Sequence, residues 1–186
     1  MTPTLNALYE FDAAHSQSAR LSDMGLILLS PPEQPWPGET PLNSFVFAHT
    51  GGDSVHFCLL DVSGSGITEQ SPVIMVVPCG YDRTRFVVGD SVRDFLALGC
   101  TIGFFFLEQL AYNFEETLTY IFDYDTFVKH CYFGQLPPAD DLSRLAAQRQ
   151  LLHELSAAFR LEPWPDPKTK FKQLQQRWTQ HIQLPS

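Results

Sequence analysis

At 186 residues with 44% hydrophobic side chains, the chain can bury a core without disulfides, because folding at this size hides roughly 70% of the unfolded surface. The net charge of −9 argues against a nucleic-acid partner, since such binding depends on neutralising phosphates with Lys and Arg. Residues 1–125 hold 4 Arg, no Lys and 16 Asp and Glu, a net charge of −12 that can attract a basic protein, whereas residues 126–186 carry +3.

The chain opens on a helix start signal, Thr2 followed by Pro3, with apolar residues at helical spacing behind it. A short buried strand follows at residues 26–29. The segment "SPPEQPWPGETP" holds five prolines and predicts a loop without regular structure. Its Trp36 can either anchor a partner or fold down as a lid over the core.

The middle of the chain is rich in predicted strands. Residues 45–49 and 54–60 flank a Gly-Gly turn, which is typical of a hairpin because glycine adopts positive φ without a steric penalty. Further strands are predicted at residues 72–78 and 85–89. Asp90 then caps a helix that we expect to end at Gly99.

Two shorter segments come next. "FFFLEQLAYN" predicts a short helix in which Glu108 and Gln109 face water. Residues 114–135 fit either helix or strand, since Thr, Tyr and Ile favour strands but the charges do not alternate cleanly.

Two helices are predicted in the tail. Asp140 or Asp141 caps the first, and Asp166 with Pro167 starts the second. The apolar stripe of the first is Leu142, Leu145, Leu152, Leu155 and Phe159, and that of the second is Phe171, Leu174, Trp178 and Ile182. We expect the second helix to pack on the first. Lysines near its start call for an acidic neighbour or phosphate, unless they simply face water.

The stretch "HTGGDSVHFCLLD" is the strongest candidate for chemistry. His49, Asp53 and His56 could bind a metal, but side chains alternate along a strand and nothing supplies a second shell. The more apolar strand face belongs in the core, so we expect His56 on the more exposed face or at an edge. Cys79 precedes a glycine but lacks a nucleophile motif. We therefore predict a structural hairpin, no catalytic residue, no metal and no cofactor.

The pattern of the four cysteines also predicts a structural role. There is no Cys-x-x-Cys pair, and the cysteines lie beside apolar neighbours, as buried free thiols do: Cys58, Cys79, Cys100 and Cys131. With no signal-peptide pattern and no apolar run of about 20 residues, we expect a cytoplasmic protein without a membrane partner.

The pattern over residues 45–113 resembles the SUKH superfamily. It has a glycine-containing hairpin, an apolar strand and a short helix of the "F..FL" type. The residues that carry the resemblance are Gly51, Gly52, Val55, Phe57, Val73, Val76, Phe95 and Leu96. It implies an α+β fold with a central, largely antiparallel sheet flanked by helices. It also implies a non-enzymatic role, often that of an immunity protein that binds and blocks a toxin.

We therefore expect a SUKH-like α+β domain over residues 1–135 and a C-terminal two-helix extension, residues 136–186, packed on it. The expected function is protein binding without catalysis, with a basic toxin as one candidate partner. Two alternatives stay open: a metal-dependent or cysteine hydrolase using residues 49–58, and a self-associating regulatory protein. Candidate partner-binding residues are acidic or aromatic groups on turns: Trp36, Asp53, Tyr81 and Asp82. The oligomeric state is left open.

Overall fold

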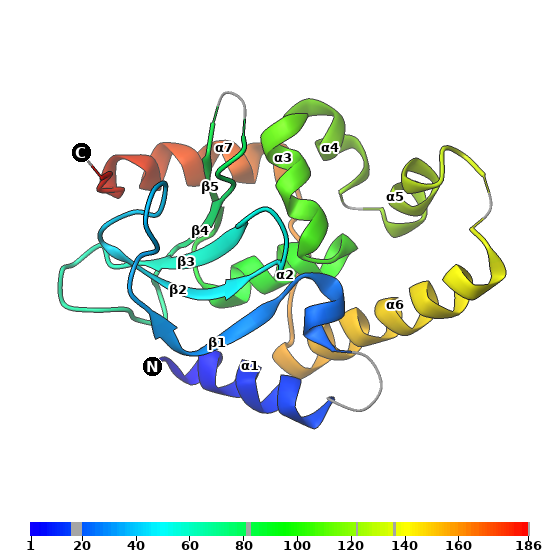
Figure 1. Cartoon of the computed structure of the whole chain (residues 1–186), viewed down its shortest axis with the longest axis horizontal. Coiled ribbons are helices and arrows are strands. Elements are labelled where there is room, and N and C mark those ends of the chain that lie inside the picture. The colour runs from blue at the N-terminus through cyan, green and yellow to red at the C-terminus, as the bar shows by residue number, and fades with distance from the viewer. Residues whose placement is uncertain (16–19, 81–82, 122, 136, 186) are drawn as a thin grey trace.

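The computed structural model describes residues 1–15, 20–80, 83–121, 123–135 and 137–185. Within them, five strands form one antiparallel sheet in the order β1-β2-β3-β4-β5, with helices packed around it (Figure 1). The strands are β1 (Ile27–Glu33), β2 (Ser44–His49), β3 (His56–Leu60), β4 (Val73–Val76) and β5 (Arg85–Gly89). The helices are α1 (Pro3–Ala14), η1 (Leu21–Met24), α2 (Val92–Ile102), η2 (Phe105–Glu108), α3 (Gln109–Tyr112), α4 (Phe114–Tyr120), α5 (Tyr124–Cys131), α6 (Ala139–Phe159), α7 (Pro167–Trp178) and η3 (Thr179–His181). The expected α+β class, with helices at the C-terminal end, is confirmed.

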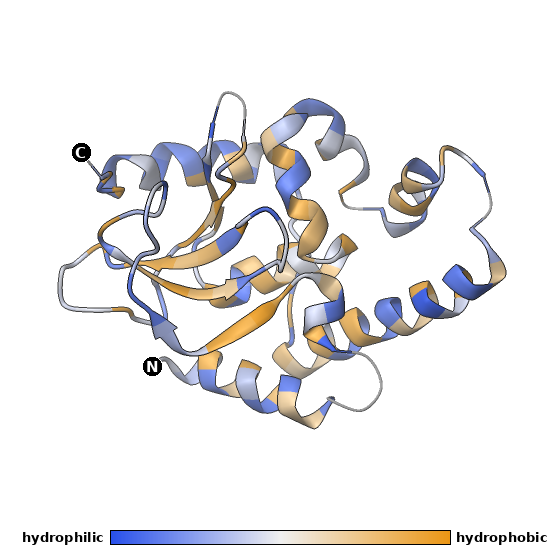
Figure 2. Ribbon diagram, viewed as in Figure 1, coloured by the Kyte–Doolittle hydropathy of each residue, from blue (hydrophilic) through white to orange (hydrophobic). Residues whose placement is uncertain are grey.

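The core lies between the sheet and α2. The Phe57 ring of β3 and the Phe47 ring of β2 lie 4.8 and 5.8 Å from the ring of Phe95 on α2. Because side chains alternate along a strand, His56 and Cys58 point to the opposite face. That face is also covered, since every residue of β3 is buried. Figure 2 shows hydrophobic residues concentrated on the strands and α2, as a doubly covered sheet requires.

The N-cap of helix α2 lies one residue after the predicted cap, and the helix ends four residues beyond the predicted stop. Ser91, not Asp90, is the N-cap, and its side chain accepts a hydrogen bond from the Asp94 amide. The helix passes through Gly99 and ends at Gly103. Gly99 is a packing residue, because a Cβ atom there would collide with the Phe104 ring. The predicted stop at Gly99 was wrong because a glycine can serve close packing as well as a helix end.

Strand β1 continues into the proline-rich segment, where no regular structure was expected. It pairs with β2 at Ile27, Leu28 and Glu33, and the register shifts between the last two. Pro31 and Pro32 lie in this irregular stretch of an edge strand, where the missing N–H of proline is tolerated. The prediction of a loop is therefore correct only for the residues that follow Glu33.

The segment 114–135, which fits either state, forms two helices, α4 over Phe114–Tyr120 and α5 over Tyr124–Cys131. The Asp123 side chain caps α5 by accepting hydrogen bonds from the Asp125 and Thr126 amides. The local cap decides the state here, because the strand-favouring residues find no partner strand.

Helix α6 is buried only in its second half. Leu152, Leu155 and Phe159 belong to the core, whereas Leu142 is 51% exposed. The first half projects away from the sheet alongside α5 (Figure 1). The predicted stripe is thus continuous in sequence, but only its C-terminal part packs on the body, chiefly against α2.

Helix α7 begins at the predicted cap, where the Asp166 side chain accepts a hydrogen bond from the Thr169 amide. It packs mainly along β5 rather than on α6, which was the expected neighbour. Gln175 explains the choice: its side-chain amide donates to the Val87 carbonyl at 2.9 Å and accepts from the Val87 amide at 3.2 Å. The outer edge of β5 offers backbone groups that α6 lacks, so the helix docks there.

Across the described residues no single helix is long and apolar enough to cross a membrane. Residues 92–102 and 105–112 reach that length and apolarity only as a pair bent by 97°.

Candidate functional site

The β2–β3 hairpin holds the residues that the sequence marks for chemistry. His56 is buried, with 3% of its surface exposed, so the prediction that it lies exposed or at an edge was wrong. Its Nδ1 lies 2.7 Å from the Ser54 carbonyl and its Nε2 lies 2.8 Å from the Thr40 hydroxyl. A carbonyl only accepts, so Nδ1 carries the proton and Nε2 accepts from Thr40. Burial, with His49 nearby, holds the pKa of His56 below its usual range.

Trp36 closes the space above this histidine. Its ring centroid lies 4.8 Å from that of His56 and 5.8 Å from that of His49. Its indole N–H donates to the Glu33 carboxylate at 2.8 Å. The proline-rich segment is pinned again further on, where the Arg85 guanidinium pairs with the Glu39 carboxylate. Trp36 is therefore half-buried as a lid, the second of its two predicted roles, and its partner-binding role stays a prediction.

These contacts give His56 a structural task. The Thr40–His56 pair has the hydroxyl-to-imidazole geometry of a nucleophile and its base, but both side chains are buried and Trp36 covers the ring. Among the described residues, no three His, Cys, Asp or Glu side chains are grouped so that they could hold a metal ion.

The cysteines divide by burial. Burial raises the pKa of the Cys58 and Cys100 thiols to about 12, so both stay protonated and are poor nucleophiles. Cys131 is partly buried, and burial raises its pKa as well. Cys79 is exposed, contrary to the expected buried thiol, because the turn after β4 in which it lies is not covered by the core.

The predicted partner-binding residues are only partly placed. Asp53 is exposed on the β2–β3 turn, with a positive φ of 46°. Tyr81 and Asp82 lie outside the described residues. Trp36 and Asp53 therefore remain the two candidates whose surroundings are known, one half-buried on the lid and one in water.

Glu108, which was expected to face water, is an acidic neighbour of Asp53. Glu108 of η2 is only 8% exposed, and it makes no hydrogen bond or ion pair with any described residue. Burial and the charge of Asp53 raise the pKa of Glu108. The sequence alone hides this pairing, because η2 is a 3₁₀ segment and not the α-helix that was assumed when Glu108 was assigned to water.

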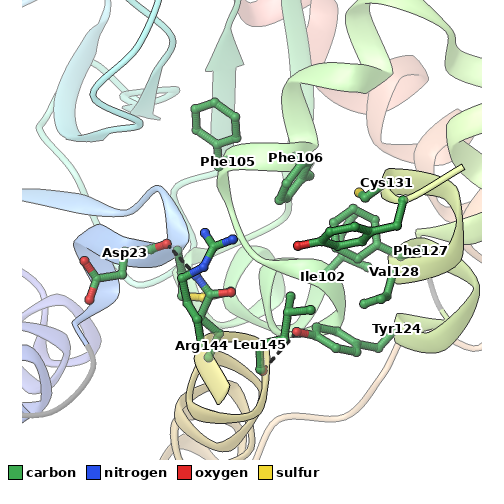
Figure 3. A pocket seen from close by; sticks show the side chains of 13 residues that line it. Asp23, Ile102, Phe105, Phe106, Tyr124, Phe127, Val128, Cys131, Arg144 and Leu145 are labelled. Carbon is green, nitrogen blue, oxygen red and sulfur yellow. Dashed lines mark hydrogen bonds between the residues drawn. The ribbon is translucent and has the colours of Figure 1, made fainter. Parts of the chain in front are cut away.

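Phe105 links this acidic pair to a pocket. Its Cε2 atom lies 3.7 Å from the position that a Cβ atom on Gly52 would take, so the ring lies against the hairpin turn. The side chain is 39% exposed and lines the pocket from the side of η2 (Figure 3).

The pocket has a volume of about 500 Å³ and lies between η1, the end of α2, η2, α5 and α6 (Figure 3). Its lining is mainly apolar and aromatic, with a few polar groups. The lining residues are Asp23, Met24, Ile102, Phe105, Phe106, Tyr124, Phe127, Val128, Cys131, Tyr132, Arg144, Leu145 and Gln148. Volume and lining are typical of a ligand or partner pocket.

Hydrogen bonds hold the helices around the pocket in place. The Tyr124 hydroxyl of α5 donates to the Leu145 carbonyl of α6 at 3.2 Å, and the Gln148 amide donates to the Asp23 carbonyl at 3.2 Å (Figure 3). The Phe106 and Phe127 rings, which also line the pocket, pack edge to face with their centroids 4.5 Å apart. The opening between the helices is therefore built into the fold.

Arg144 is the cationic side chain among the described residues that line the pocket. Its Nη2 lies 2.8 Å from Asp141, which also accepts a hydrogen bond from the Tyr132 hydroxyl at 2.9 Å. Both partners lower the pKa of Asp141, so the carboxylate stays ionised and offsets the arginine. Arg144 consequently leaves the mouth of the pocket without a surplus of positive charge.

The basic tail neutralises a different set of carboxylates. Lys170 bridges Asp90 and Asp94 at 2.8 and 3.0 Å, and Lys168 pairs with Glu115 at 2.6 Å. Lys168 and Lys170 thus have acidic neighbours, one of the two alternatives for these lysines, whereas Lys172 is exposed. These pairs lie by β5, α2 and α4, and within the described part of the tail no residue forms an ion pair with Asp53 or Glu108.

Sequence reasoning missed the pocket altogether. Its walls come from segments as far apart as Asp23 and Gln148, and no local pattern brings them together. The one available signal was the run Phe104–Phe105–Phe106, since three consecutive phenylalanines cannot all face one core. Comparison with family models, with curated proteins and with solved structures finds no match to this chain.

Proposed function

We propose that this chain is a non-catalytic protein-binding domain whose partner is a basic protein. A toxin held inactive by an immunity protein is the partner that the SUKH resemblance implies. The single observation that carries the proposal is an acidic pair, Asp53 and Glu108, next to a half-exposed phenylalanine and an apolar pocket.

The acidic pair favours a cation from outside. Two neighbouring carboxylates repel each other, and partial burial adds the cost of removing Glu108 from water; both effects raise its pKa. No described residue pairs with Glu108, and contact with water offsets only part of this cost because the side chain is 8% exposed. A Lys or Arg from a partner would offset it on binding.

The distribution of charge supports the same partner. Residues 1–125 carry −12, and the ion pairs made by the basic tail lie at Asp90, Asp94, Glu115 and Asp125. The acids that these pairs leave, Asp53 and Glu108 among them, can steer a cationic molecule, which raises the rate of encounter more than the lifetime of the complex.

The test is binding kinetics against the protein that co-purifies from the native host, at low and high salt. Association should slow as salt rises, because exposed charges are screened beyond about 8 Å at physiological ionic strength. Asp53→Lys should lower the on-rate more than it raises the off-rate.

Glu10→Lys is the matched control, since it makes the same change in net charge from an exposed position on α1. Its on-rate should stay closer to that of the unmodified protein. An on-rate indifferent to salt and to Asp53→Lys would contradict the proposal.

A further inference from the structure

We propose that the pocket between η2, α5 and α6 binds an apolar side chain from a basic, amphipathic segment of the partner, while a Lys or Arg of that segment lies against Asp53 and Glu108. This inference rests on the proposed function and names the part of the surface that anchors the complex. The geometry and the charge of the site carry it together.

The pocket suits an anchor side chain. Its volume of about 500 Å³ exceeds what one side chain fills, and its walls are apolar and aromatic, led by Phe106, Phe127 and Val128. Binding energy in protein complexes concentrates where one large side chain enters a desolvated pocket. Phe105, at the rim, offers a further apolar surface to the same partner segment.

The pocket is formed before any partner arrives. The hydrogen bond from Tyr124 to the Leu145 carbonyl and that from Tyr132 to Asp141 join α5 to α6 on either side of it. Arg149 adds a contact at the base, where it lies 3.3 Å from Asp125 and 5.1 Å from the centre of the Tyr124 ring. These contacts fix part of the site before binding, which lowers the cost of ordering its side chains in the complex.

Charge decides which apolar segment fits. Asp141 offsets Arg144 inside the site, while Asp53 and Glu108 lie beside Phe105 without a described cation. A partner segment that brings an apolar residue together with a Lys or Arg satisfies both features at once. An acidic segment would place like charges together, which is destabilising.

The test uses two defined probes on the full chain: an amphipathic helical peptide of leucine and lysine, and its counterpart of leucine and glutamate. Leu145→Trp fills the pocket while leaving the carbonyl that Tyr124 binds. Ala147→Trp is the matched control, because it adds the same bulk at an exposed position on α6 that does not line the pocket. Affinities are measured by fluorescence anisotropy, and thermal melting checks that each variant is folded.

The leucine–lysine peptide should bind in a saturable, salt-weakened manner, and the leucine–glutamate peptide should not. Leu145→Trp should lower the affinity at least about tenfold, a loss of about 1.4 kcal/mol, and Ala147→Trp should leave it unchanged. If Leu145→Trp fails to fold, Phe105→Ala replaces it, since that side chain is 39% exposed and its loss should weaken binding in the same direction. Equal binding of both peptides, or full affinity in the filled variant, would overturn the inference.

The same variants separate this inference from the proposed function. If the co-purified partner associates in a salt-dependent manner that Asp53→Lys slows, but Leu145→Trp and Phe105→Ala bind it normally, then only the pocket inference fails. If association is indifferent to salt and to Asp53→Lys, the proposed function itself fails. Co-purification of a second copy of this chain alone would favour the self-associating alternative over both.

Discussion

His56 is buried and neutral, and for this reason the free energy of unfolding depends on pH. His56 has a lowered pKa because burial penalises its charged form. As pH falls through about 6.5, the unfolded chain takes up a proton that the folded chain resists, and the unfolded state gains stability. The contribution of His56 is therefore complete above about pH 6.5 and is lost progressively below it.

We predict that His56→Gln flattens the dependence of the unfolding free energy on pH between neutrality and mild acid. The loss it removes amounts to about 1.4 kcal/mol for each unit by which the folded pKa lies below the unfolded one. Urea unfolding at a series of pH values measures the slope. His153→Gln, at an exposed position on α6, is the control and should keep the original slope. An unchanged slope in His56→Gln would show that other groups set the acid sensitivity.

The burial of His56 could not be predicted because strand alternation compares only the two faces of one strand. Val55, Phe57 and Leu59 mark the more apolar face correctly, and they do pack toward the core. The second face is covered by Trp36, whose segment lies about twenty residues earlier in the chain. The local pattern of β3 therefore gives no indication that Trp36 covers His56.

At the scale of an element, a side chain of α7 binds the backbone of β5 as a neighbouring strand would. Gln175 makes two hydrogen bonds to the backbone of Val87, on the side of β5 that faces no other strand. Lys170 and Trp178 add contacts to Asp90 at 2.8 and 2.6 Å at the end of the same strand. These contacts join the tail to the sheet edge.

We predict that Gln175→Ala lowers the unfolding free energy by about 1–3 kcal/mol, since it leaves a backbone donor and acceptor of β5 without their partners. Gln173→Ala, exposed on the same helix, should change it by less than about 0.5 kcal/mol. Chemical unfolding of both variants measures the difference. Equal effects would mean that the hydrogen bonds to Val87 add nothing beyond helix packing.

Elements with a complete local signal were predictable. The apolar run Arg85–Gly89 matches β5 residue for residue, and the Asp166–Pro167 signal gives the start of α7. Strand β1 extended past its prediction because the cost of proline depends on whether the strand lies at an edge, which the sequence does not state. The predicted packing of α7 on α6 was also wrong, because an apolar stripe shows which face of a helix is buried but not which element covers it.

Across the whole molecule, burial falls steeply from the sheet to the α5–α6 arm. Strands β3 and β4 are buried throughout, whereas most residues of 139–149 are exposed or half-exposed. Few buried apolar contacts mean a low free energy of local opening. The wall of the candidate pocket that α6 supplies is therefore the less stable one.

We predict that amide hydrogen exchange is slowest in β3 and β4 and fastest, among the helices, in residues 139–149. Mass spectrometry of the exchanged protein gives the rates segment by segment. In the presence of the leucine–lysine peptide, residues 139–149 should gain protection while β3 stays unchanged. Strong protection of residues 139–149 in the free protein at low concentration would contradict the expected gradient.

The two sheet edges have a consequence for how any partner can recognise the molecule. Pro31 and Pro32 remove two backbone donors from β1, and Gln175 occupies the outward backbone groups of β5 at Val87. A partner therefore gains little by adding a strand of its own to either edge, a mode that would accept many sequences because it reads the main chain. Recognition is left to side chains, and side chains distinguish one partner from its near relatives by single substitutions. A protein built in this way can change its partner in evolution by altering a few surface residues while the sheet beneath them stays the same.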